Sequence, residues 1–259
     1  MRSVLGADYQ NLPRPIGILI AEYPAGNYDP PHLHPRAQMI YATDGVISVM
    51  TEEASFTIPP QRAVWVPAGV RHEAISKSHV SLKTLYIRPD AHPGLPTRAQ
   101  VLKVSPLLRE LIVEASGMEL EYDEAGREGR LMGLILDEIV ESARRAAVAL
   151  QIRMPATARL VKVCRDVMRE PAREADLGAC ADAAGMSRRT FTRAFRAETG
   201  MSFNAWHQQV RLAEALSLLS QGQSVTTAAF DVGYNSASAF TAMFRRTFGV
   251  APRGYFAEA

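Results

Sequence analysis

Four residues in the first third of the chain have the types and spacing of a metal-binding cluster. His32, His34 and Gln38 share parity along one segment, so a regular strand would project all three to one face. His72 lies further along the chain and can join them from another strand. Three neutral imidazoles and an amide oxygen can hold a divalent transition metal, with nickel, zinc, copper or iron all conceivable. We therefore predict a candidate metal site at these four residues.

The same four residues also fit an organic effector. Their polar groups can line a cavity and hydrogen-bond to a small molecule, to one another and to water. Gln38 is neutral and supplies no charge to a cation, so a metal would be held weakly, which suits a reversible sensor. Metal, organic effector and a site that has lost its function all stay open. Arg36 and Tyr41 are candidates for the mouth of such a cavity, and His207 is expected at the surface.

A second constellation, between Leu177 and Gly249, occurs twice in the chain. The landmarks that recur 49 positions on are the pairs Phe191/Phe240, Phe195/Phe244, Arg196/Arg245 and Gly200/Gly249. Gly185 recurs 48 positions on as Gly233, where the chain leaves a helix and favours positive φ. Ser187 and Asn235 follow as candidate N-caps of the next helix. Each copy therefore has the pattern of a helix-turn-helix.

The outer faces of the two second helices differ in chemistry. The first carries a basic and hydrogen-bonding stripe, which consists of Arg188, Arg189, Thr192, Arg193 and Arg196. These side-chain types contact base edges and phosphates in a DNA major groove. The second carries small residues until its end, and its candidate DNA contacts are Asn235, Ala237, Ser238, Thr241, Ala242, Arg245 and Arg246. We expect the first copy to contact bases and the second to rely on phosphates and thymine methyl groups.

The length of the chain and the distribution of its charge agree with two domains that bind different partners. The chain has 259 residues and a formal charge of +2. Residues 1–152 hold 15 basic and 18 acidic residues, and residues 153–259 hold 14 and 9, so the halves carry −3 and +5. A mildly acidic front half and a basic back half suit a regulatory domain joined to a nucleic-acid domain. No run approaches a membrane span or a signal peptide, so we expect a cytoplasmic protein without membrane contact.

The front half is predicted to be an all-β barrel or sandwich, because short apolar runs alternate with Pro and Gly turns. The expected strands are 16–20, 38–41, 46–49, 63–66 and 80–87. Residues 89–104 are rich in proline and are expected to form a linker. Residues 1–95 would then be the barrel, and 96–150 a linker and helical region.

Helices are predicted at 106–116 and 129–149, and the second has a wide amphipathic stripe. Such a stripe either packs on the barrel or forms a dimer interface with a second chain, and we favour the dimer. Residues 150–154 are expected to be an extended connector. The domain 151–259 is predicted to be all-α, with the helix Ser202–Gln221 setting the separation of the two helix-turn-helix units.

Residues 156–259 resemble the AraC/XylS family of bacterial transcription regulators. The segments that carry the resemblance are 187–191, 195–200, 211–215, 233–240 and 244–252. In this family, the base-contacting positions of the first unit fall on Arg189, Thr192 and Arg193. Those of the second fall on Ala237, Ser238, Thr241 and Ala242. Ala242 is shorter than the side chain of many relatives, which weakens direct base contact by the second unit.

Residues 15–90 resemble a cupin barrel. The first cupin motif is matched in its spacing by Gly26, His32, His34, Gln38 and Gly45, and the second by Pro67, Gly69 and His72. The departures are Gln38 for Glu, Gln61 for Gly and Ser76 for Asn. The segment Ala63–Gly69 is similar to a subgroup of the AraC/XylS family that includes a nickel-responsive regulator of an efflux pump, which favours nickel or zinc.

The sequence thus predicts an α+β two-domain protein, with a cupin-like sensor barrel, trailing helices and an all-α double helix-turn-helix domain. We expect a homodimeric regulator that binds a double-stranded DNA operator, answers to a small molecule or metal, requires no cofactor and can contact RNA polymerase. The alternative is a metal-dependent cupin oxygenase or isomerase with an accessory DNA-binding domain. Gln38 in place of a carboxylate, and the twin DNA-binding pattern, argue against an enzyme.

Overall fold

The computed structural model describes residues 3–145 and 151–255, and the chain divides into two compact units. The first contains residues 1–51 and 58–149, and the second contains residues 52–57 and 150–259. The predicted helical region 96–150 therefore lies in the first unit, apart from its last residue. Within the described ranges, none of the helices combines the length and apolarity needed to span a bilayer.

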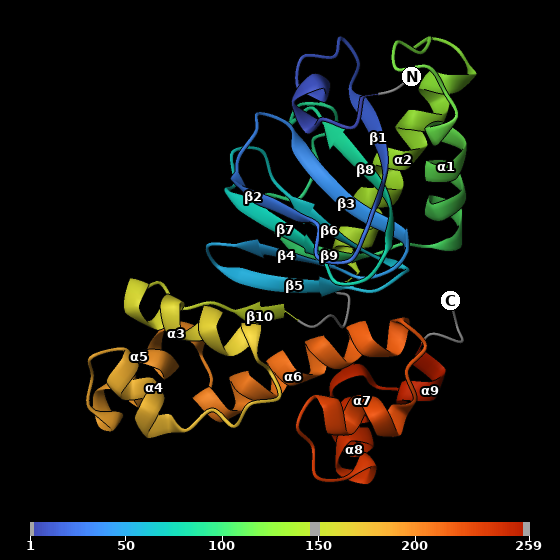
Figure 1. Ribbon diagram of the computed structural model, residues 1–259. Helices are drawn as coiled ribbons and strands as arrows, with labels where there is room; N and C mark the ends of the chain where they lie inside the picture. The colour runs from blue at the N-terminus through green and yellow to red at the C-terminus, as the bar shows by residue number, and fades with distance from the viewer. Residues whose placement is uncertain (1–2, 146–150, 256–259) are drawn as a thin grey trace. The chain divides into compact units, whose positions relative to one another are not determined.

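The first unit is a β-sandwich of two antiparallel sheets (Figure 1). Of the two predicted architectures, barrel and sandwich, the structure has the sandwich. One sheet has the order β1 (Ile16–Tyr23), β8 (Val80–Ile87), β3 (Ala37–Asp44), β6 (Arg62–Val66) and β9 (Gln100–Lys103). The other contains β4 (Ile47–Thr51), β7 (His72–Ser76) and β2 (Tyr28–His32) in neighbouring positions. A short 3-10 helix, η1 (Gly6–Tyr9), precedes β1.

Alternation along β3 and β8 gives the first sheet two chemically different faces. Met39 and Leu85 belong to the hydrophobic core that the sheet shares with helices, and both are fully buried. Gln38 and Thr84, one position away in each strand, line a pocket on the opposite face. Side chains in a strand alternate between faces, so the fully buried run in β3 serves both a core and a pocket.

Helices α1 (Pro106–Ser116) and α2 (Arg127–Arg144) cover the apolar face of this sheet. Ser105 caps α1 by accepting a hydrogen bond from the amide of Leu108 at 3.0 Å. Ile112, Ile135 and Ile139 are fully buried against the strands. The amphipathic stripe of α2 is thus used within the chain, which is the packing alternative that the sequence left open. The outer faces still expose large apolar residues, namely Leu107, Val113 and Leu134.

Two segments that were not predicted as strands, a linker and an extended connector, contain strands. The predicted linker 89–104 includes β9, which pairs with β6, and Pro96 accepts a hydrogen bond from the Trp65 indole at 2.8 Å. The predicted connector 150–154 includes β10 (Gln151–Arg153), which pairs with β5 (Ala54–Ile58). These strands are short and lack an alternating pattern, so only their partners stabilise them as strands. Leu150 lies outside the described residues.

The second unit contains the helices in the order that the repeat predicted. They are α3 (Ala158–Arg169), α4 (Leu177–Ala183), α5 (Arg188–Thr199), α6 (Phe203–Ser220), α7 (Val225–Asp231), α8 (Ala237–Phe248) and α9 (Pro252–Tyr255). Ser202 caps α6, as expected, by accepting a hydrogen bond from the Ala205 amide at 3.2 Å. The α4–α5 and α7–α8 pairs are the two helix-turn-helix units, and α6 connects them (Figure 1).

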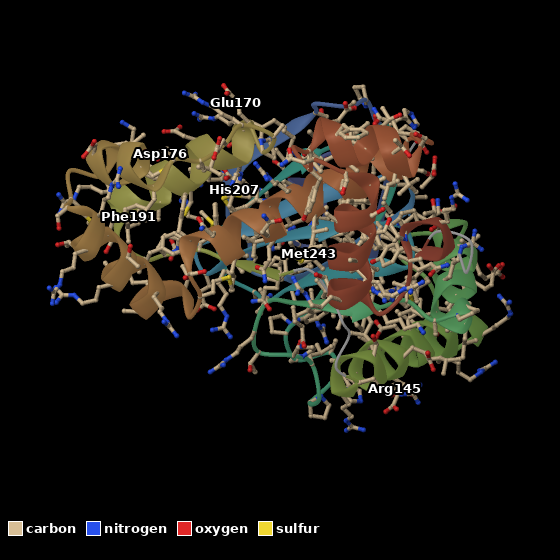
Figure 2. All side chains as sticks on the ribbon, turned by 90° about the horizontal axis from the view of Figure 1, so that it is seen from below. Arg145, Glu170, Asp176, Phe191, His207 and Met243 are labelled. Carbon is tan, nitrogen blue, oxygen red and sulfur yellow. The ribbon has the colours of Figure 1, made fainter. Side chains whose placement is uncertain are left out.

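Aromatic rings hold the first of these units against α6. Phe191 and Phe195 are buried and lie 5.3 Å and 5.2 Å from the ring of Phe203, with mutually perpendicular rings. Such edge-to-face pairs stabilise a core beyond the apolar area that they bury. His207 is labelled in Figure 2, and the prediction that it lies at the surface is wrong because its side chain is buried. Its ring is buried beside Phe203, and its Nε2 lies 3.0 Å from the carbonyl of Pro171.

Candidate metal centre and nucleic-acid interface

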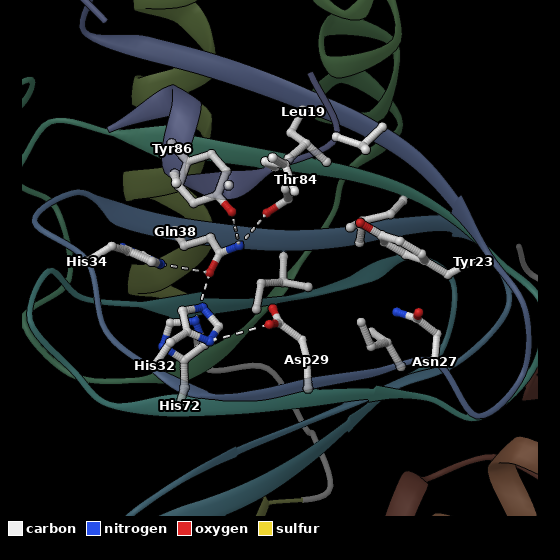
Figure 3. A pocket seen from close by; sticks show the side chains of 18 of the residues that line it. Leu19, Tyr23, Asn27, Asp29, His32, His34, Gln38, His72, Thr84 and Tyr86 are labelled. Atoms are coloured by element: carbon white, nitrogen blue, oxygen red, sulfur yellow. Dashed lines mark hydrogen bonds and ion pairs between the residues drawn. The ribbon is translucent and has the colours of Figure 1, made fainter. Parts of the chain in front are cut away.

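The structure brings the four predicted ligands together at one end of the pocket between the two sheets. His32 ends β2 and pairs in register with His72 at the start of β7, while Gln38 lies on β3 after His34 (Figure 3). One ligand atom from each histidine lies within 4.8 Å of the others. His34, Gln38 and His72 are buried, and a third of the His32 side chain is exposed.

Backbone carbonyls orient all three imidazoles. The Nδ1 atoms of His32, His34 and His72 lie 2.8, 2.6 and 2.9 Å from the carbonyl oxygens of Pro30, Arg36 and Val70. A carbonyl is only an acceptor, so each Nδ1 carries a hydrogen, and a ring with a single hydrogen then presents a lone pair at Nε2. In metal sites, the histidine nitrogen that does not bind the metal commonly donates to a carbonyl in the same way, and this hydrogen bond orients the ring.

Gln38 places a further lone pair among these nitrogens. Its Oε1 lies 3.1 Å from Nε2 of His34 and 2.9 Å from Nε2 of His72. Both nitrogens of each of these two rings therefore face oxygen acceptors, although a neutral imidazole has only one N–H. In each ring, the contact between Nε2 and Gln38 Oε1 then joins two lone pairs with no hydrogen between them. A cation placed between these lone pairs would satisfy both contacts.

Protonation does not supply that cation at neutral pH. Burial lowers the pKa of His72 to about 4 and also lowers the pKa of His34, so both rings are neutral. The Gln38 amide donates to Thr84 Oγ1 at 3.0 Å and to the Tyr86 hydroxyl at 3.2 Å, which directs Oε1 toward the histidines. A half-turn of this amide would offer N–H to both rings, and this is the arrangement expected without a cation.

The pocket extends well beyond the cluster. Its volume is about 560 Å³, which lies within the range of small-molecule sites. Apolar side chains from several strands line it, including Leu19, Ile40, Ile47 and Leu82. Tyr23 and Asn27 lie across the pocket from the cluster in Figure 3. Burial raises the pKa of Tyr23, so its hydroxyl is neutral and can donate or accept.

The two residues that the sequence suggested for the mouth of the pocket, Arg36 and Tyr41, lie elsewhere. Tyr41 is part of the core between the sheet and its helices. Arg36 is buried, and its guanidinium donates to the carbonyls of Leu12 and Arg14 at 2.5 and 2.9 Å, so it holds the segment before β1. Asp29 and Tyr86 line the pocket without having been predicted. Alternation along β8 puts Tyr86 on the same face as Thr84 and could have found it. The irregularity of β2 between Asp29 and His32 breaks the alternation, so parity gave no signal for Asp29.

In the first helix-turn-helix unit, local capping orients the predicted DNA-contacting stripe. Ser187 accepts a hydrogen bond from the Thr190 amide at 3.2 Å, and Gly200 ends α5 with φ +79°. Phe191 and Phe195 face the core. All predicted contacts of this unit are exposed. Arg189, Thr192, Arg193 and Arg196 lie away from these two rings, whereas Arg188 precedes Phe191 by three residues and lies beside Gly178 of α4.

In the second unit, the cap of α8 is Ser236, so the prediction of Asn235 as N-cap is wrong. Ser236 accepts from the Ala239 amide at 3.2 Å, and Gly249 ends the helix with φ +79°. The extra residue of the second turn therefore precedes the cap. Ser238, Ala242, Arg245, Arg246 and Asn235 are exposed, and Ala237 and Thr241 are half-buried. Arg246 donates to Met243 Sδ at 3.0 Å, along its own helix.

The small residues of α8 leave its outer face hollow. A depression of about 510 Å³ is lined by Ala237, Ser238, Thr241, Ala242 and Arg245 from this helix, together with the start of α7 and of α9. Arg253 of α9 also lines it and was missed from the sequence. The repeat offers no signal for Arg253, because the position 49 residues earlier is Asn204.

A sandwich with a polar-ended pocket, followed by two helix-turn-helix units on a connecting helix, defines a ligand-responsive DNA-binding transcription regulator. A family model described as an AraC-like ligand binding domain matches residues 16–151, and a helix-turn-helix domain model matches residues 180–258. The chain therefore belongs to the AraC family of transcription regulators. This confirms the resemblance on which the sequence prediction rested.

Among its relatives is the transcriptional regulator NimR of Escherichia coli, which is 33% identical over 231 residues, covering 88% of this chain and 82% of NimR. RipA of Corynebacterium glutamicum is 34% identical over 99 residues, covering 38% of this chain and 30% of RipA. Among solved structures, fatty-acid-bound ToxT from Vibrio cholerae covers 93% of this chain and 94% of its own, with 14% identity and a TM-score of 0.39. The DNA-binding domain of AdpA, solved with a target DNA, is 33% identical over 39% of this chain and 93% of its own, with a TM-score of 0.37.

Proposed function

We propose that a divalent transition metal, bound by His32, His34, His72 and Gln38, controls how this regulator occupies its operator. The observation that carries the proposal is the cluster of three imidazoles, each held by a backbone carbonyl, whose ligand atoms lie within 4.8 Å of one another. The donor set of three nitrogens and one amide oxygen suits nickel or zinc. When bound, such an ion would link β2, β3 and β7 through their ligands. Its effect on DNA requires a different metal affinity in the two states of the regulator.

Metal content and DNA occupancy test this proposal together. Purified protein is loaded with Ni²⁺ or Zn²⁺ and analysed for bound metal, and its binding sites are mapped genome-wide with and without added metal. We expect about one ion per chain and a changed occupancy, both lost in His32→Ala. His79→Ala is the matched control, because His79 is exposed and lies outside the cluster. A His32→Ala protein that keeps its metal and its response would end the metal proposal.

An organic effector without metal is the second candidate, and the size and apolar lining of the pocket favour it. It predicts that small apolar molecules bind equally to metal-free protein and to protein loaded with metal. Calorimetric titration of both forms separates the two candidates.

For the DNA, α5 would contact base edges and α8 would contact phosphates. Support comes from the exposed arginines of α5, Arg188, Arg189 and Arg193, at positions where α8 has Ala237, Ser238 and Ala242. Arg245 and Arg253 remain beside the hollow to neutralise phosphate charge. The outer faces of α1 and α2, with Leu107, Val113 and Leu134 exposed, support a homodimer.

Cytoplasmic location, contact with RNA polymerase and the absence of enzymatic turnover belong to the same proposal. The homologues are transcription regulators, which supports a non-enzymatic role. The pocket offers Asp29 as its one acidic residue among the described lining residues, and more than half of its side chain is exposed. Turnover of any substrate without specific DNA binding would favour the cupin-enzyme alternative instead.

A further inference from the structure

The charge of the proposed metal site is not balanced by the protein. A divalent ion among three neutral imidazoles and a neutral amide keeps both of its positive charges. Among the described residues that line the pocket, none is basic and Asp29 alone carries a carboxylate. That carboxylate lies 3.6 Å from His32 Nδ1 and is 58% exposed. One anionic partner therefore faces a charge of +2, and a buried uncompensated charge is costly.

The pocket has room for the missing anion and for an apolar body attached to it. Its 560 Å³ is far more than an ion and its water ligands require. Beyond the cluster, the walls include the apolar side chains Leu19, Ile40, Ile47, Ala74 and Leu82, with the polar side chains of Tyr23 and Asn27 across from the histidines (Figure 3). A hydrated inorganic anion would leave these walls in contact with water, whereas an apolar body would cover them.

A hydroxyl donor stands beside the position of the anion. The Tyr86 hydroxyl accepts from the Gln38 amide, which leaves its own hydrogen to donate to a second acceptor. Tyr86 lines the pocket next to Gln38 and His34, and its ring lies 5.3 Å from the His34 ring. An anion that binds the metal at this end of the pocket would therefore also meet a neutral donor.

We propose that the effector is a monoanionic organic acid bound together with the metal. Its carboxylate coordinates the ion beside Gln38 and Tyr86, and its apolar body lies between the two sheets. The carboxylate thus supplies the negative charge that Gln38 does not supply. This inference rests on the proposed metal site and names the effector of that same site. Metal and acid must then increase each other's affinity by the same factor.

Calorimetric titration of the full-length protein with Ni²⁺ tests this coupling. The probe is octanoate, with octanamide as the uncharged control of equal length and acetate as the control without an apolar body. We expect octanoate to tighten Ni²⁺ binding by about tenfold or more. Acetate should tighten it less, and octanamide should leave it unchanged. Equal effects of acetate and octanoate would show that the apolar walls are not used and would overturn the proposal.

Gln38→Glu provides the sharpest variant, because it places the missing negative charge within the protein. Ni²⁺ should bind this variant more tightly without any acid, and octanoate should lose its effect. His79→Ala should keep the full coupling, and near-native circular dichroism confirms that each variant is folded. Octanoate that still tightens Ni²⁺ binding in Gln38→Glu would overturn the charge argument.

The failures of the two proposals are distinguishable. Absence of Ni²⁺ binding by the wild-type protein, with or without octanoate, would refute the metal site itself. Normal Ni²⁺ binding that octanoate does not change would refute only the organic acid. Octanoate that binds metal-free and Ni²⁺-loaded protein with equal affinity would overturn this inference as well, and would favour the metal-free effector.

Discussion

Arg193 on α5 and Ala242 on α8 occupy the same position in the two helix-turn-helix units. Each follows its capping serine, Ser187 or Ser236, by the same interval, and both side chains are exposed. Arginine at this place reaches outward with a planar guanidinium that can bind two acceptors of a guanine. Alanine leaves part of the hollow on α8. The two units are therefore alike in fold and unlike in what they offer to DNA.

Replacing Arg193 with alanine should weaken specific binding and relax sequence preference. A lost bidentate base contact costs about 1–3 kcal/mol and removes discrimination at the contacted base. Binding to the selected operator and to random duplex is measured at one salt concentration. Ala242→Ser is the control and should change both affinities little. An equal loss on operator and random duplex would show that Arg193 contacts only phosphate.

Arg245 should behave differently from Arg193. It lines the hollow of α8, where Ala237 and Ala242 offer no hydrogen-bonding groups to bases. We expect Arg245→Ala to weaken binding uniformly across sequences and to reduce the slope of log K against log salt by about 1. Arg253→Ala should have the same effect. A variant with unchanged salt dependence and altered sequence preference would mean that the second unit contacts bases directly.

The sequence was sufficient to predict the second unit because its signals are local. Caps, glycines and aromatic pairs lie within a few residues of one another, so Ser187, Gly200 and Phe191 mark the ends and inner face of α5 without any distant partner. The wrong cap at Asn235 has the same origin. The repeat has one extra residue in the second turn, and the sequence alone did not show on which side of the cap it lies.

The first unit was predicted less completely, because its strands depend on distant partners. The sequence grouped His32, His34 and Gln38 by their parity along one strand, and the structure brings them together with His72. The reason was wrong, because His32 ends β2 and Gln38 lies on β3 of the other sheet, with a bend between them. The orientation of the Gln38 amide could not be predicted. It depends on Thr84 and Tyr86, which reach Gln38 only through the register of β3 with β8. Strand register over such separations is set by tertiary packing.

Gly178 provides a way to move one DNA-contacting arginine without removing it. A Cβ added at this glycine of α4 would contact Arg188 Nη2 and lie 2.8 Å from its Nε. Arg188 is exposed and its guanidinium is the end of a flexible side chain, so it can move aside at little cost in stability. Alanine also favours the helical backbone over glycine by roughly 0.5–1 kcal/mol.

We therefore expect Gly178→Ala to keep or raise the unfolding temperature while weakening DNA binding as much as Arg188→Ala does. The double variant should bind DNA no more weakly than Arg188→Ala alone, because the glycine acts through the arginine. Affinity for operator duplex and thermal unfolding of the three variants measure this. Additive losses in the double variant would mean that alanine at position 178 itself obstructs the DNA.

Glu198 should make the start of α3 sensitive to acid. Its carboxylate accepts from the amides of Ala156 and Thr157 at 2.8 and 2.9 Å and from the Thr157 hydroxyl at 2.6 Å. Partial burial acts to raise the pKa of Glu198, but these donors outweigh it and the pKa is lowered. A lowered carboxyl pKa stabilises the fold above the unfolded value of about 4.3, and this contribution is lost as the pH falls through the lower folded value.

Glu198→Gln should accordingly destabilise α3 by about 1–2 kcal/mol at pH 7, as the loss of a capping side chain does. Its single amide oxygen cannot accept from all three donors of the carboxylate, and its NH₂ group is directed at a donor. Hydrogen exchange of the α3 amides reports this local loss without requiring the whole chain to unfold. The difference from wild type should shrink as the pH falls from about 4.3 through the lower folded pKa, because only below that folded value is the wild-type carboxyl protonated in both states. Glu174→Gln, at an exposed position before α4, should show no such loss at either pH. A difference that persists unchanged at low pH would assign the effect of Glu198 to packing rather than to its charge.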